Sequence, residues 1–95
     1  MGNSRFLVCE NSIHTYHGMD VRCRWVIDQQ MNSIIDAHVG GPDKDAARPA
    51  WISLNEDGVR SLSSTFSTAV KETSTEVSAL PEWASARFSV PISQH

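Results

Sequence analysis

Residues 20–28, DVRCRWVID, decide the fold of this chain. Apolar side chains alternate with mostly charged ones along this segment, which is the period of a β-strand with one face in a core and the other in water. The inward positions are Val21, Cys23, Trp25 and Ile27, and the outward positions are Asp20, Arg22, Arg24, Val26 and Asp28. Because antiparallel sheets commonly keep one face in water, the segment predicts a strand of an antiparallel sheet.

Three other segments predict further strands, at residues 5–10, 33–39 and 51–54. The segment 33–39 also fits a short helix, because the residues before it tolerate helix well. The Gly-Gly-Pro sequence that follows it favours the strand, and the two alternatives stay open. The polar residues 11–19 predict a long loop between the first two strands.

A single long helix is predicted to begin after Asn55, a strong N-cap that is followed by two acidic residues. Leu54 and Val59 have the spacing of a hydrophobic staple, which fixes how a chain enters a helix. Apolar residues recur at helical spacing until Pro81, but the second half is rich in Ser and Thr. The helix is therefore predicted to span residues 55–74 or to continue to 80.

The remaining residues 81–95 are predicted to form an extended tail. In this tail Trp83 is interpreted as a core side chain, and Trp51 is interpreted in the same way at the start of its strand. Both could also serve as anchors at an interface, where tryptophan is enriched.

These elements predict a single domain over residues 1–95, of the α+β class. Its architecture is a small two-layer domain in which an antiparallel sheet of three to five strands packs against one main helix. One helix covers one face of such a sheet. We therefore expect the other face to be open, and we expect a small non-catalytic domain to bind its partner there or at an exposed sheet edge.

Composition restricts the partners of the chain. It has 95 residues, a formal net charge of −3 and only two lysines. Binding to nucleic acid is disfavoured, because neutralising several phosphates requires a concentrated basic face. The sequence contains neither an apolar stretch typical of a secretory signal nor one that would span a membrane, so a cytoplasmic protein is expected.

The segment 9–23, CENSIHTYHGMDVRC, carries four metal-binding residue types in the order Cys9, His14, His17 and Cys23. Zinc takes four such ligands, but structural zinc sites usually pair them as C-x2-4-C and H-x3-5-H. We therefore interpret the cysteines as buried apolar side chains and the histidines as solvated loop residues. A metal site and a disulfide bond remain the alternatives, and no cofactor is expected.

No signature of a catalytic nucleophile, a phosphate-binding loop or a dinucleotide fingerprint occurs in the sequence. We therefore predict that the protein is not an enzyme and has no catalytic residues. His38 alternates with Asp36 along its predicted strand, so both are expected on the water-facing side as surface polar residues.

The sequence predicts a small binding protein that acts by protein–protein association. Inhibitors, immunity or anti-defence proteins, regulatory adaptors and the accessory proteins of phages or mobile elements have this profile. The predicted partner contacts lie on the outward strand face that carries Arg22 and Arg24 and in the predicted loop at residues 40–50. They are Arg22, Arg24, Asp43, Lys44, Asp45 and Arg48. A nucleic-acid-binding module that uses the open sheet face is the alternative, and an exposed edge strand leaves a homodimer open.

Overall fold

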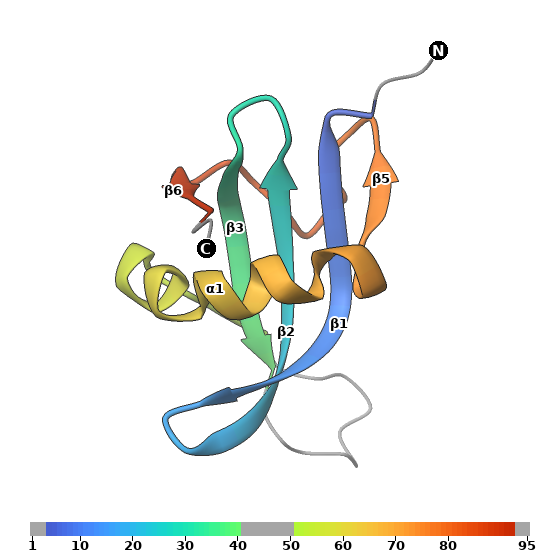
Figure 1. Ribbon diagram of the computed structural model, residues 1–95. Helices are drawn as coiled ribbons and strands as arrows, with labels where there is room; N and C mark the ends of the chain where they lie inside the picture. Colours follow the sequence, from blue (N-terminus) through green and yellow to red (C-terminus); the bar gives the residue numbers. More distant parts are fainter. Residues whose placement is uncertain (1–3, 41–50, 93–95) are drawn as a thin grey trace.

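A computed structural model describes residues 4–40 and 51–92 of the chain (Figure 1). It contains one helix and a sheet of six strands. In chain order the elements are β1 (Phe6–Tyr16), β2 (Met19–Asp28), β3 (Ser33–Gly40), β4 (Trp51–Ser53), α1 (Glu56–Thr73), β5 (Thr75–Val77) and β6 (Val90–Pro91). The α+β class with an antiparallel sheet and one helix is confirmed, whereas the predicted count of three to five strands is too low.

The strand order of the sheet is β4-β3-β2-β1-β5, and β6 pairs with β3 beside this path. All neighbours are antiparallel. The segment 33–39, which fitted a strand or a helix, is a strand and extends to Gly40. β5 and β6 lie where a helix end and a tail were predicted. They were not predicted because strands of two or three residues are too short to show an alternating pattern.

The predicted loop at residues 11–19 is wrong. β1 continues to Tyr16, and a two-residue turn leads directly into β2. His17 and Gly18 both have positive φ, 52° and 76°, as a type I′ hairpin turn requires. A register shift between Cys9 and Ser12 marks a bulge that takes up the polar residues before the strand resumes.

The helix follows its predicted signals closely. The side chain of Asn55 accepts a hydrogen bond from the amide of Gly58 at 2.8 Å, which caps the N-terminus. The helix ends at Thr73, the shorter of the two predicted lengths. Its apolar stripe lies on the sheet, where the Phe66 ring stacks on Trp25 with their centroids 5.2 Å apart.

The prediction that the sheet face opposite the helix is open is wrong, because the C-terminal part of the chain covers this face. After β5 the chain runs behind the sheet, on the face opposite the helix, and reaches β6, which pairs with β3 (Figure 1). The sheet therefore lies between the helix and the chain that joins β5 to β6. We call residues 78–92 the C-terminal segment. Its side chains Leu80, Trp83 and Ala84 pack against a small second core formed by Val8, Val26 and Ile35. Trp51 and Trp83 are each half-buried rather than enclosed in a core.

Candidate functional site

A group of polar and aromatic side chains holds the C-terminal segment on the sheet. We call this group the clasp, and its members are Arg24, Asp36, His38, Trp51, Trp83 and Arg87. β2, β3 and β4 each contribute to it from the face opposite the helix, and the C-terminal segment contributes the last two residues. The antiparallel register sets Arg24 beside His38, and His38 beside Ser53, two residues after Trp51.

Arg24 lies at the centre of the clasp, between two tryptophan rings. Its guanidinium carbon is 4.6 Å from the ring centroid of Trp51 and 4.4 Å from that of Trp83. Cation–π contacts of this kind favour arginine, whose flat group can stack on two rings at once. Arg24 therefore links a strand at the edge of the sheet to the C-terminal segment.

His38 joins Arg24 to the buried carboxylate of the clasp. Its Nδ1 accepts a hydrogen bond from Arg24 Nε at 3.0 Å, and its Nε2 lies 3.7 Å from an Asp36 oxygen. Because Nδ1 is the acceptor, the neutral ring carries its proton on Nε2. Trp83 meets the imidazole edge-on, with the ring centroids 5.5 Å apart.

Asp36 anchors the C-terminal segment through both of its oxygens. One oxygen accepts from Arg87 Nε at 2.8 Å, and the other accepts from the backbone amide of Ser85 at 3.0 Å. Arg87 also donates to the carbonyl oxygens of Leu54 and Ala37. Asp36 and His38 are both buried, so the prediction that they are surface polar residues is wrong. The C-terminal segment, which the local pattern could not place, covers them.

The protonation of His38 is set by this surrounding. Burial lowers the pKa of His38 below the ordinary histidine value, Asp36 opposes this shift, and the cations of Arg24 and Arg87 add to it. The imidazole is therefore neutral at pH 7 and acts as a hydrogen-bond acceptor for Arg24. Its role in the docked clasp depends on that neutral state.

A second candidate surface lies at the end of the sheet formed by the β1–β2 turn and β4. We call it the open end. Its members Tyr16, Met19 and Ile52 lie on the helix side of the sheet, and its members Ile13, Arg22 and Trp51 lie on the opposite face. Ile13, Met19 and Ile52 are 60%, 59% and 66% exposed. An apolar groove of about 350 Å³ runs between the turn and β4, lined by Tyr16, His17, Met19, Val21, Val39, Gly40, Ile52 and Leu54.

The two predicted partner-binding arginines lie on the same sheet face but in different surroundings. Arg24 belongs to the clasp, whereas Arg22 lies nearer the hairpin turn, opposite Gly40 in the register and 5.6 Å from the Trp51 ring centroid. Trp25 lies on the other face, as predicted, and is fully buried. The other predicted contacts, Asp43, Lys44, Asp45 and Arg48, lie outside the described residues.

The Cys-His pattern of residues 9–23 does not form one cluster. Cys9 pairs with Trp25 and Cys23 with Ser12 across the β1–β2 hairpin, and both cysteines are free and buried. His17 is exposed in the turn. His14 is buried in β1, so its assignment to a solvated loop is wrong. Across residues 4–40 and 51–92, no three His, Cys, Asp or Glu side chains are arranged to hold a metal ion.

Cys23 and His14, which are buried, have shifted pKa values that keep both side chains uncharged at pH 7. Burial, with a smaller effect from Cys9, raises the pKa of the Cys23 thiol to about 11, so it is protonated and a poor nucleophile at pH 7. Burial lowers the pKa of His14, whose Nε2 lies 2.6 Å from Ser12 Oγ and whose ring meets Phe66 edge-on. This pair lies beneath the helix as part of the core.

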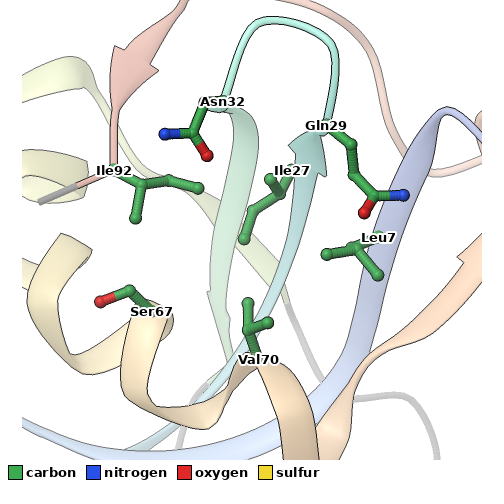
Figure 2. A pocket seen from close by; sticks show the side chains of 7 residues that line it. All are labelled: Leu7, Ile27, Gln29, Asn32, Ser67, Val70 and Ile92. Atoms are coloured by element: carbon green, nitrogen blue, oxygen red, sulfur yellow. The ribbon is translucent and has the colours of Figure 1, made fainter. Parts of the chain in front are cut away.

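A small cavity opens between α1 and the end of the sheet near the β2–β3 turn (Figure 2). Its volume is about 250 Å³, and it is lined by Leu7, Ile27, Gln29, Asn32, Ser67, Val70 and Ile92. This volume is below the usual range for sites that enclose a small molecule, about 300–1,000 Å³. Its apolar walls and amide rim suit one apolar side chain better than a cofactor.

Sequence reasoning missed Arg87, and it named Trp51 and Trp83 as core side chains or interface anchors without predicting that they meet Arg24. Their spacing carries no motif, and they come from different elements of the chain. The one available signal was the composition of the tail, which places an aromatic and an arginine four residues apart after a proline.

Comparisons with protein-family models, curated proteins and solved structures find no match for this chain. In the described part of the chain, α1 lacks the apolar character required of a membrane-spanning helix.

Proposed function

We propose that this chain is a non-catalytic binding protein that associates with another protein through the open end of its sheet. The observation that carries the proposal is the gathering of exposed apolar side chains there. Four large apolar side chains of the described residues are more than half exposed, and two of them, Met19 and Ile52, line the groove of the open end, while Ile13 lies on the other face of the same hairpin. Scattered apolar side chains need no explanation, but clustered ones mark interaction surfaces.

The composition of the open end supports the same proposal. Tyrosine, tryptophan, methionine and arginine are the residue types enriched at protein interfaces, and Tyr16, Trp51, Met19 and Arg22 supply one of each. The groove between the turn and β4 can receive an apolar anchor from a partner. Inhibitors, immunity or anti-defence proteins and regulatory adaptors act by binding a partner protein, which such a surface would allow.

The two predicted contact arginines, Arg22 and Arg24, differ in how well they suit a partner contact. Arg24 is held between Trp51 and Trp83 and hydrogen-bonded to His38, so its substitution will disturb the docking of the C-terminal segment. Arg22 lies at the open end, beside the exposed Ile13 in the register of β1 and β2. Arg22 is therefore the better of the two as a contact residue.

The experiment compares Met19→Asp/Ile52→Asp with Met31→Asp. Met31 is 53% exposed and lies in the β2–β3 turn, at the other end of the sheet, so it is a matched control. The wild-type chain, immobilised, identifies a stoichiometric partner from its source, and calorimetry with the purified partner gives Kd. We expect the double variant to weaken binding at least about 30-fold, since losing a central anchor typically costs about 2 kcal/mol. Equal affinities of both variants, with unchanged folding, would reject the open end.

A nucleic-acid-binding module is the second candidate. The observation that favours it is the presence of Arg22, Arg24, Trp51 and Trp83 on one sheet face, since aromatic rings and arginines bind single strands. Fluorescence anisotropy with labelled single-stranded and duplex oligonucleotides at low salt tests it. Binding that weakens steeply with salt supports this candidate, and no binding at low salt excludes it.

A further inference from the structure

We propose that the clasp is a pH-sensitive latch in which protonation of His38 releases the Trp83 end of the C-terminal segment from the sheet. The latch is a conformational device that goes beyond the proposed binding function and does not depend on it. It rests on the geometry that joins His38 to Arg24 and, through Arg24, to Trp83.

The first step concerns the hydrogen bond between Arg24 and His38. Arg24 Nε donates to Nδ1 of the imidazole at 3.0 Å, so Nδ1 is the position at which an incoming proton binds. The protonated ring carries N–H groups on both nitrogens. An N–H on Nδ1 faces the N–H of Arg24 Nε, and the hydrogen bond is replaced by the repulsion of two donors.

The second step concerns charge. The charged groups around His38 are Arg24 from β2, Asp36 from β3 and Arg87 from the C-terminal segment, and Glu10 of β1 acts on Arg24. Asp36 is the only carboxylate among those three groups, and its oxygens already accept hydrogen bonds from Arg87 and from two backbone amides. A third cation is therefore poorly compensated, because burial strengthens its repulsion from Arg24 and Arg87.

The third step links this repulsion to the C-terminal segment. Arg24 relieves the clash by leaving His38, and doing so takes it out from between Trp51 and Trp83. Trp83 then loses its cation–π contact, while its edge contact with His38 becomes a contact with a charged ring. Residues 87–92 stay bound through the hydrogen bonds of Arg87 and the pairing of β6 with β3, so residues 80–85 open first and uncover Val8, Val26 and Ile35.

The test follows amide hydrogen exchange of the full chain by NMR at about pH 7.5 and about pH 5. Two amides report on docking, because Ser85 N donates to Asp36 and Arg87 N donates to the Ile35 carbonyl oxygen. We expect the protection factor of Ser85 to fall about ten-fold for each pKa unit by which folding has lowered the pKa of His38. Amides in the centre of β2 exchange only on global unfolding, so they should stay far better protected than Ser85 at both pH values.

Two histidine variants make the test specific. His38→Gln can still accept from Arg24 Nε but cannot gain a charge, so protection of Ser85 should no longer depend on pH. His14→Gln removes the other buried histidine and should leave the pH dependence intact. The proposal is overturned if protection in the wild-type chain is independent of pH, or if His38→Gln retains the wild-type change.

A titration of the wild-type chain keeps the proposal falsifiable if His38→Gln does not fold. The Cε1 proton of His38 and the indole Nε1 proton of Trp83 are followed by NMR across the same pH range. Coincident midpoints support the latch. Different midpoints would show that Trp83 does not respond to His38 and would also overturn it.

Discussion

The two faces of the sheet are covered by different means. On the helix face, Val59, Leu62 and Phe66 are buried against Trp25 and its neighbours, and even the buried indole N–H of Trp25 lacks a hydrogen-bond partner within the described residues. On the other face, the C-terminal segment is held by one buried carboxylate, two arginines, a histidine and two tryptophans. The helix face depends on apolar area, whereas the clasp depends on satisfied polar groups.

Each face also contains one buried histidine in a similar aromatic setting. His14 meets Phe66 at a centroid distance of 5.4 Å, and His38 meets Trp83 at 5.5 Å. The surroundings differ in charge, because His38 has Asp36, Arg24 and Arg87 as neighbours while burial alone accounts for the lowered pKa of His14. The difference shows that a small domain can bury one histidine within its main core and another within a network of charged side chains.

The largest expected effect is on the helix face. Phe66→Ala removes a fully buried ring that stacks on Trp25 and should lower the free energy of unfolding by about 3–5 kcal/mol. Small domains have about 5–15 kcal/mol in total, so this variant will be marginal. Urea unfolding followed by circular dichroism measures the loss. A loss below that of the clasp variant in the next experiment would contradict the division between the faces.

An intermediate effect is expected from Asp36→Asn in the clasp. The amide keeps the shape of the side chain but loses the charge that Arg87 pairs with, and its NH2 group opposes a backbone donor. Because Arg87 is one-third exposed, we expect a cost of about 2 kcal/mol, with loss of protection at Ser85. Glu56→Gln, which breaks the exposed pair with Arg60, is the control and should change stability by less than about 0.5 kcal/mol.

The smallest effect is the acid dependence shared by the two faces. Burial lowers the pKa of both His14 and His38, so below about pH 6.5 the unfolded chain binds protons that the folded chain does not. Their contribution is complete above that pH and is lost as pH falls towards the folded-state values. Urea midpoints at several pH values should show this decline, reduced in His14→Gln and in His38→Gln. A stability that rises on mild acidification would contradict the assigned shifts.

The parts of the fold that follow from local chemistry could be predicted. The alternation in residues 20–28 predicts β2 and the inward position of Trp25, and Asn55 with its acidic neighbours predicts the start of α1. These signals are local because a strand repeats every two residues and a cap involves one helical turn. The same logic failed for residues 11–19, where a bulge lets a polar stretch remain in a strand.

The sequence by itself therefore determined the helix, the longest alternating strand and the residues that face the main core. Only the tertiary structure decided which groups meet on the second face. Asp36 and Arg87 are 51 residues apart, and the C-terminal segment that joins them has no period from which its path could be read. Whether a polar side chain is exposed or buried depends on which distant segments of the chain cover it. For this reason Asp36 and His38 were predicted to lie on the surface but are buried in the clasp.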